Sequence, residues 1–92
     1  MYASIRQYRS SDPSALARRA KSFVSIVRQV PGFSGWYVVD GGDGTVITVT
    51  LCEDQAGVEE SVTKAADWVR ENASELFEGS PTITNGEVVV QA

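Results

Sequence analysis

The residues best suited to hold a small molecule lie along one stripe of a predicted helix that follows Asp54. Ser61, Trp68 and Asn72 share this stripe, because at 100° per residue these three positions fall close together on a helix. A tryptophan supplies a flat apolar wall with one N–H donor, and an asparagine supplies a donor and an acceptor for a carbonyl or a phenol. We place the stripe at the border of the apolar face, at the rim of a pocket between helices and sheet. In the alternative, Trp68 covers the edge of the core and Asn72 caps or solvates the end of the helix.

Other kinds of chemistry lack the residues they need. The sequence contains no histidine, which excludes Ser–His and Cys–His nucleophilic catalysis and disfavours a transition-metal site, so we expect no metal ligands. Residues 41–44 (Gly-Gly-Asp-Gly) lack the lysine and the spacing of a phosphate-binding loop and are typical of a hairpin turn. Cys52 precedes Glu53 and Asp54, an acidic setting that favours a small apolar role over a reactive thiolate.

The length and composition predict one domain over residues 1–92, with 42% hydrophobic and 22% charged residues. The net charge of −4 argues against nucleic-acid binding, and no apolar run approaches the roughly 20 residues that span a membrane. A single cysteine and the absence of a signal-peptide pattern at the start favour the cytoplasm. Residues 1–30 carry six basic residues and one acidic residue, so a basic first helix that binds an acidic partner is a further possibility.

Periodicity predicts six elements separated by turn residues. Residues 1–9 alternate in the manner of a strand, with Tyr2, Ser4, Arg6 and Tyr8 on one face. Asp12 and the following proline begin a helix, since Asp is a favoured N-cap and Pro a favoured first residue. The predicted elements are strand 1–9, helix 12–30, strand 35–40, strand 45–52, a helix from 54 to 76, and strand 83–91 interrupted at Asn85–Gly86.

The order β-α-β-β-α-β is typical of the α+β, ferredoxin-like fold, a four-stranded antiparallel sheet with two helices on one face. Both faces of this sheet are apolar. Strand 45–52 places Ile47, Val49 and Leu51 on one side and a valine and two threonines on the other. Because two helices cover only one face, the other face would be an exposed apolar patch. We therefore expect a homodimer in which sheet packs on sheet.

Three segments carry a family resemblance that covers nearly the whole chain. They are Pro31-Gly32-Phe33 at the end of the first helix, Gly35–Asp40 (Gly-Trp-Tyr-Val-Val-Asp) running into a glycine-rich hairpin, and Ala65–Val69 (Ala-Ala-Asp-Trp-Val). With these segments the sequence resembles the dimeric α+β-barrel superfamily, and within it the small proteins related to antibiotic biosynthesis monooxygenases. The superfamily includes cofactor-free monooxygenases, heme-degrading enzymes, muconolactone-isomerase-like enzymes and stress-response proteins, so the resemblance implies a fold and not one activity.

In the cofactor-free monooxygenases, Trp, Asn, Tyr and Arg side chains hold an aromatic substrate as its anion, which then reacts with oxygen. The resemblance implies such parts for Trp36, Tyr37, Trp68, Asn72 and Arg6, with no cofactor. Alternatively, Trp36 packs in the dimer interface and the arginines are snorkelling or stacked side chains. Heme-degrading relatives hold iron through a helix histidine, which is absent here.

Two functions stay open from the sequence. The first is a cofactor-independent monooxygenase that acts on a small aromatic or polyketide-like substrate. The second is a non-enzymatic module that binds a small aromatic or anionic molecule or serves in a stress response. Arg6 and Arg19 are the candidate anion-binding arginines.

Overall fold

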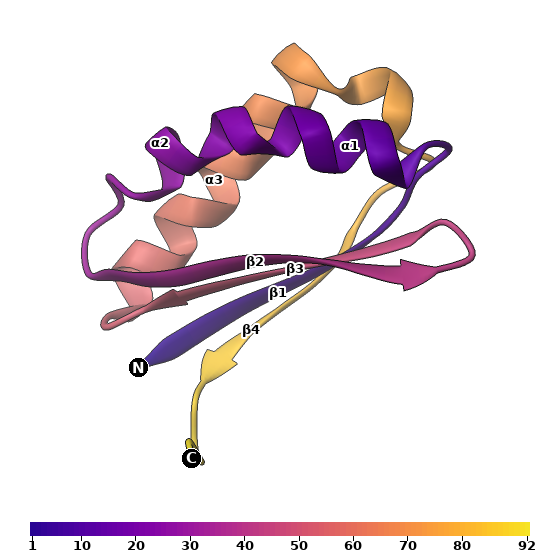
Figure 1. The fold of residues 1–92 in the computed structure, drawn as a ribbon. Coiled ribbons are helices and arrows are strands. Elements are labelled where there is room, and N and C mark those ends of the chain that lie inside the picture. The colour runs from indigo at the N-terminus through magenta and orange to yellow at the C-terminus, as the bar shows by residue number, and fades with distance from the viewer.

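One layer of helices lies over one face of a four-stranded antiparallel sheet (Figure 1). The computed structural model describes all residues, 1–92. The predicted α+β, ferredoxin-like class is confirmed. Its elements in chain order are β1 (Tyr2–Arg9), α1 (Pro13–Ala20), α2 (Val24–Val27), β2 (Phe33–Gly42), β3 (Thr45–Cys52), α3 (Gln55–Asn72) and β4 (Thr82–Glu87), with 3-10 turns at Lys21–Phe23 and Ser74–Leu76.

The sheet has the strand order β2-β3-β1-β4, so β1 lies in its interior. Arg6 of β1 is paired with Thr48 of β3 on one side and with Ile83 of β4 on the other. Since side chains alternate along a strand, this register sends Arg6 and its paired threonine toward the helices together. The predicted alternation of β1 is confirmed, because Ser4, Arg6 and Tyr8 are buried and the residues between them are exposed.

The hairpin between β2 and β3 forms where the glycine-rich turn was predicted. Gly42, Asp43 and Gly44 have φ angles of 83°, 52° and 79°, the left-handed region that glycine and aspartate tolerate best. β2 is longer than predicted at both ends and contains irregularities between Phe33 and Gly35 and between Asp40 and Gly42. The β3 bounds agree with the prediction.

The first helical segment is broken where one helix was predicted. Asp12 caps α1 as expected, because its side chain accepts a hydrogen bond from the Ala15 amide at 3.1 Å. The single helix over 12–30 is wrong: a 3-10 turn at Lys21–Phe23 divides it into α1 and the short α2. The apolar spacing alone did not reveal this break, since the predicted core positions still face the sheet. The buried members are Leu16, Ala20, Phe23, Val27 and Val30.

The buried face of α3 is centred differently from the prediction. Val58, Ser61, Ala65 and Trp68 form it, whereas Ala66, predicted to be core, is exposed. The border position that we expected for Ser61 and Trp68 is therefore wrong, and both lie within the core face. A serine is accommodated there because its hydroxyl donates to the Val58 carbonyl at 2.6 Å.

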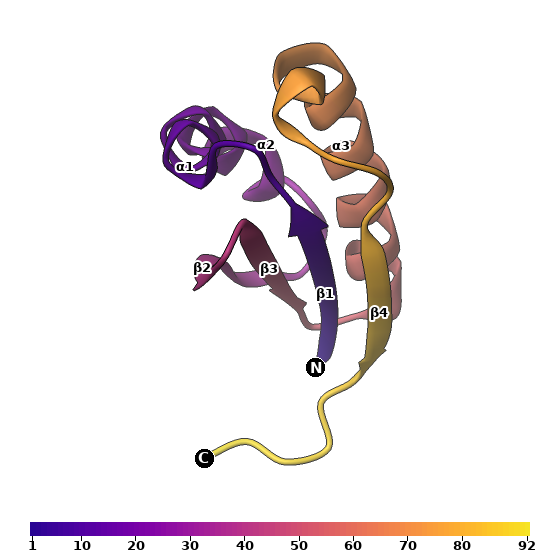
Figure 2. The same cartoon turned by 90° about the vertical axis from the view of Figure 1, so that its right-hand side faces the viewer.

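The last strand is shorter than predicted. β4 ends at Glu87, and its pairing with β1 continues without interruption through Asn85 and Gly86, so the predicted bend is absent. The following residues leave the sheet as a tail (Figures 1 and 2), in which Val89 and Val90 are 83% and 85% exposed. Valines favour strands, but no neighbouring strand of this chain lies beside them.

The sheet face opposite the helices has no cover within the chain (Figure 2). Ile5, Tyr37 and Val39 on this open face are 42%, 57% and 46% exposed. The register groups them with Ile47 and Val49 of β3. None of the helices combines the length and the apolar character that a membrane crossing requires.

Candidate functional site

A small cavity of about 30 Å³ lies between the helical layer and the sheet. Strands β1, β2 and β3 form its floor, α1 and the 3-10 turn after it form its roof, and α3 forms one wall. Eleven of its thirteen lining residues are hydrophobic, which makes the wall suitable for an apolar ring. We call this space the Arg6 cavity. Its lining consists of Arg6, Tyr8, Leu16, Ala20, Phe23, Trp36, Val38, Val46, Thr48, Ala65, Trp68, Val69 and Phe77.

Arg6 extends from the middle of β1 into the core and is only 2% exposed. Its Nε donates to Thr48 Oγ1 and its Nη2 to Thr50 Oγ1, each at 3.1 Å. Its Nη1 donates to the backbone carbonyl of Ser61, also at 3.1 Å. Strand register and the close approach of α3 therefore hold the guanidinium in one orientation from three sides.

No carboxylate balances the charge of this buried arginine. The ion pairs of the molecule are Arg19 with Glu75 and Arg70 with Asp67, both at the surface. A guanidinium has five N–H donors, and the three bonds of Arg6 leave one hydrogen on each Nη without a partner. Burial lowers the Arg6 pKa, and the nearby Tyr8 opposes this effect. An arginine side chain still carries its charge at neutral pH, so Arg6 is a desolvated cation with donors to spare.

Tyr8 is the other ionisable residue of the cavity lining. Burial raises the pKa of its phenol, and this exceeds the opposing effects of the Arg6 charge and of a hydrogen bond with Thr48. Tyr8 is therefore a neutral phenol at physiological pH and offers no base. The cavity lining contains no carboxylate, and no group of three or more Cys, Asp or Glu residues is arranged to hold a metal ion.

Three aromatic side chains form the end of the cavity nearest α2. The Phe23 ring is tilted against Trp36 and Trp68, with ring centroids 5.5 and 5.9 Å apart. The Trp36 indole N–H is buried and has no acceptor. The Trp68 Nε1 instead donates to Ser22 Oγ at 3.0 Å. The cavity thus has two unused donor groups, on Arg6 and on Trp36.

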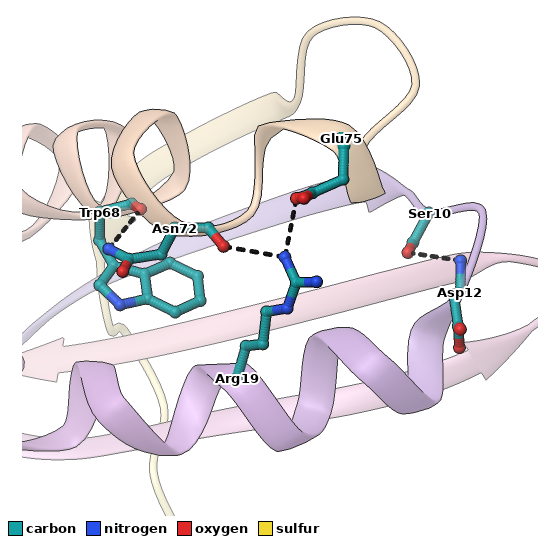
Figure 3. Close-up of polar contacts among 6 residues, drawn as sticks. All are labelled: Ser10, Asp12, Arg19, Trp68, Asn72 and Glu75. Carbon is teal, nitrogen blue, oxygen red and sulfur yellow. Dashed lines mark hydrogen bonds and ion pairs between the residues drawn. The ribbon is translucent and has the colours of Figure 1, made fainter.

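The structure brings three of the six predicted site residues to the cavity, namely Arg6, Trp36 and Trp68. Ser61 is fully buried behind Arg6 and contributes its backbone carbonyl. Tyr37 lies on the open face of the sheet, because it alternates with Trp36 along β2. Asn72 is exposed near the end of α3, and its side-chain amide donates to the Trp68 carbonyl at 3.0 Å (Figure 3).

Arg19 has a different place from the buried anion site considered from the sequence. Its guanidinium lies at the surface between α1 and the end of α3 (Figure 3). There Nη1 donates to the Asn72 carbonyl at 2.9 Å and to Glu75 Oε1 at 2.7 Å. Since Glu75 already pairs with it, Arg19 is not a free member of a basic surface.

Sequence reasoning missed Tyr8, Phe23 and the two threonines that bind Arg6. A signal was present for the threonines. Thr48 and Thr50 alternate on the same face of β3, and pairing that face with the face of β1 that carries Arg6 places hydroxyl acceptors beside an arginine. The role of Phe23 depends on the 3-10 turn, which the apolar spacing did not indicate.

Comparison with known proteins extends the fold assignment. No family model and no curated protein matches the sequence, but solved structures match across nearly its whole length. A protein of unknown function from Nitrosomonas europaea is 21% identical, with a TM-score of 0.82, over 99% of this chain and 91% of that one. The cofactor-independent oxygenase SnoaB from Streptomyces nogalater is 8% identical, with a TM-score of 0.75, over 98% and 94%.

A dimeric ferredoxin-like protein from an uncultured marine organism also matches, at 11% identity and a TM-score of 0.71, over 99% of this chain and 96% of that one. At these identities the likeness concerns the fold, and an activity does not follow from it. The resemblance stated from the sequence is confirmed for the fold: the chain has the ferredoxin-like α+β fold of these solved structures.

Proposed function

We propose that the Arg6 cavity binds a small aromatic molecule as its anion, and that the protein is a cofactor-independent monooxygenase acting on this molecule. The observation that supports the proposal is Arg6 itself, a cation that is 2% exposed and has only neutral partners. Burial of an uncompensated charge costs several kcal/mol. An anionic ligand would supply the missing charge and the acceptors for the two unused N–H groups.

The surroundings of Arg6 favour an aromatic anion over a small inorganic one. Phe23, Trp36 and Trp68 offer ring faces and edges, and most of the lining is apolar. The buried Trp36 N–H offers a second point of recognition for a carbonyl oxygen of the ligand. A flat ring system that carries one anionic oxygen and one carbonyl would satisfy both unused donors.

The cavity suits a reaction in which the substrate provides the electrons. A methylene group that two aromatic rings connect to a carbonyl loses a proton to water and becomes an aromatic enolate, whose charge Arg6 stabilises. The enolate carbon adds dioxygen to form a peroxide, which loses water and leaves a carbonyl in place of the methylene. One oxygen atom enters the product and the other leaves as water, so neither cofactor nor external reductant is needed. Because Tyr8 stays neutral, the role of the protein is to favour the anion rather than to supply a base.

Oxygen uptake with anthrone, which has such a methylene group, tests the proposal. We expect the wild-type protein to consume one dioxygen per anthrone and to form anthraquinone faster than buffer does. Arg6→Gln keeps a hydrogen-bond donor but removes the charge, and we expect it to lower the rate at least 30-fold, the effect of losing a buried charge partner. Arg9→Gln, an exposed change on the same strand, is the matched control. Equal rates for Arg6→Gln and Arg9→Gln would contradict the proposal.

A non-enzymatic binding module is the second candidate, and the absence of any base among the lining residues favours it. A binding module would need the same cationic site but no reaction with oxygen. Aromatic anions would then raise the melting temperature of the folded protein without oxygen uptake. Measuring both properties on the same ligands separates the two functions.

We also propose that the open face of the sheet pairs with a second copy of the chain, and that the protein is cytoplasmic. Ile5, Tyr37 and Val39 are large apolar side chains left exposed on that face. The exposed Val89 and Val90 of the tail add to the apolar surface that a partner would cover. The cytoplasmic proposal is supported by Cys52, the single cysteine, which is buried and forms no disulfide.

A further inference from the structure

The Arg6 cavity is too small for the ligand that its chemistry favours. Pockets that bind drug-sized molecules measure about 300–1,000 Å³, whereas this cavity has about 30 Å³, room for little more than one water molecule. Arg6, Trp36 and Trp68 belong to the sheet or to the long α3, which are held by continuous hydrogen-bond ladders. The part best able to move is the roof, residues 13–27, which carries Leu16, Ala20 and Phe23 over the cavity.

The roof has a weak point directly above the aromatic cluster. The 3-10 turn at Lys21–Phe23 separates α1 from α2, and neither glycine nor proline lies in residues 14–30 to account for it. A 3-10 stretch within a longer helix frequently marks a hinge, because its hydrogen-bond geometry is poorer than that of an α-helix. Phe23, at the end of this turn, lies between Trp36 and Trp68. Outward movement of the turn would withdraw the Phe23 ring and enlarge the cavity.

Two side-chain contacts hold the roof to α3 and the turn after it. Trp68 Nε1 donates to Ser22 Oγ at 3.0 Å, in the middle of the 3-10 turn. Arg19, one turn earlier, donates to the Asn72 carbonyl and to Glu75 (Figure 3). These contacts, which we call the latch, are accessible to water: Ser22 is exposed, and Arg19 and Glu75 retain 42% and 65% of their side-chain exposure. Exposed ion pairs contribute little and are screened by salt.

We propose that the roof is a lid hinged at Lys21–Phe23, and that the latch of Ser22–Trp68 and Arg19–Glu75 sets how often the Arg6 cavity opens to an aromatic ligand. This inference rests on the proposed function for the identity of the ligand, but the movement itself does not. Trp68 has two parts in it, since its ring lines the cavity and its N–H fastens the lid. Asn72 is a positioning residue, because its carbonyl binds Arg19 and its amide binds the Trp68 carbonyl.

Hydrogen exchange of the ligand-free protein tests the lid directly. Ser22→Ala and Arg19→Gln each remove one half of the latch, and Ser22→Ala also removes the bond that the Ser22 hydroxyl donates to the Arg19 carbonyl at 2.9 Å within the roof. Ser25→Ala and Arg18→Gln are the control variants, since both residues are exposed and their side chains make no hydrogen bond. One hydrogen bond or ion pair corresponds to about a two- to tenfold change in an opening equilibrium. We expect the amides of residues 16–27 to exchange faster by that factor in the latch variants than in the controls. Their exchange rates should not depend on low concentrations of urea, because a local opening exposes little new surface. The amides of β1 and β3 should be unchanged. Equal exchange rates in the latch and control variants would overturn the proposal of a lid.

Binding of 1-naphthoate, an aromatic anion, then connects the lid to the site. In a stopped-flow experiment followed by tryptophan fluorescence, we expect the ligand to associate two- to tenfold faster with the latch variants than with the controls. For the wild-type protein, we expect the association rate at high salt to exceed the rate at low salt, because salt screens the Arg19–Glu75 pair. An association rate independent of the latch would show that the ligand enters by another route. If 1-naphthoate binds no variant, the proposed ligand class fails, and the exchange rates still decide whether the roof opens.

Discussion

Replacement of Arg6 by methionine separates a functional arginine from a structural one. Methionine replaces the unbranched apolar stem of arginine and has no guanidinium, so Arg6→Met removes the buried cation and leaves Thr48, Thr50 and the Ser61 carbonyl without their donor. If Arg6 serves mainly to tie β1, β3 and α3 together, the change destabilises the fold and leaves ligand binding alone. If Arg6 instead serves to bind an anion, the change weakens ligand binding and leaves the stability of the fold nearly unchanged.

The magnitudes can be worked out from the contacts. Hydrogen bonds from a charged donor contribute about 1.5–3 kcal/mol each, so the three bonds of Arg6 contribute roughly 5 kcal/mol at the lower end. Withdrawal of the guanidinium from water costs several kcal/mol, and no carboxylate offsets it here. Because the two effects nearly cancel, we expect the free energy of unfolding of Arg6→Met to lie within about 1 kcal/mol of wild type. Replacement of a whole buried ion pair by apolar side chains is often neutral or stabilising, and Arg6→Met likewise leaves no carboxylate unpaired.

Binding should change far more than stability. Loss of the charge partner of a buried anion costs about 2–5 kcal/mol, which is at least a 30-fold increase in the Kd for 1-naphthoate. The assays are urea unfolding followed by circular dichroism and titration calorimetry with 1-naphthoate, with its uncharged methyl ester as the ligand control. Arg9→Met, which removes an exposed arginine bonded to Thr45, should leave both quantities near wild type. A loss of 3 kcal/mol or more in the stability of Arg6→Met, with unchanged affinity, would refute the reasoning.

Three further predictions concern the core, the pH dependence and the open face. Gly57→Ala should lower the free energy of unfolding by about 2 kcal/mol in urea unfolding, because the added methyl group would overlap the Pro31 carbonyl oxygen and the overlap outweighs the better helix propensity of alanine. Burial raises the Cys52 pKa above its ordinary 9.0 and the Tyr8 pKa above 10.0, so the unfolded state loses these protons first and stability falls as pH rises above about 9. Cys52→Ala should remove the earlier part of that fall in unfolding curves collected from pH 8 to 11, whereas an unchanged pH dependence would mean that the thiol is not the group responsible. Tyr37→Glu, in the middle of the open face, should convert a dimer into a monomer in sedimentation velocity at micromolar concentration, and a wild-type protein that is already monomeric there would contradict the proposed pairing.

The sheet could be predicted well because strand signals are local. In β3 the alternation of Val46, Thr48 and Thr50 with Ile47 and Val49 fixes which side chains share a face, and the structure agrees. The two faces of β1 were assigned correctly for the same reason. The end of β4 was predicted wrongly, because the valines after Glu87 have strand propensity but no neighbouring strand to pair with.

The helices and the site could be predicted only in part. Apolar spacing fixed the buried positions of the first helical segment but could not detect the 3-10 turn that places Phe23. For α3 the same spacing misjudged the centre of the buried face, since Ser61 is polar by type but satisfies its own hydroxyl within the helix. Trp68 therefore lies deeper than expected, and Asn72 lies on the surface. The lack of a carboxylate partner for Arg6 is a tertiary fact, because all twelve acidic residues lie outside β1 and could have reached Arg6 only through the fold.

The most direct test of an anion site at Arg6 is a nitrogen-15 NMR titration of the protein with 1-naphthoate. The Arg6 Nε–H signal, assigned by its loss in Arg6→Met, reports the guanidinium whose Nη hydrogens are unused, and the Trp36 indole N–H signal reports the other unused donor of the cavity. We predict that both signals shift together, saturate at one equivalent, and stay unchanged with the methyl ester. Shifts confined to the exposed arginines, or a response to the ester equal to that of the anion, would contradict a buried anion site.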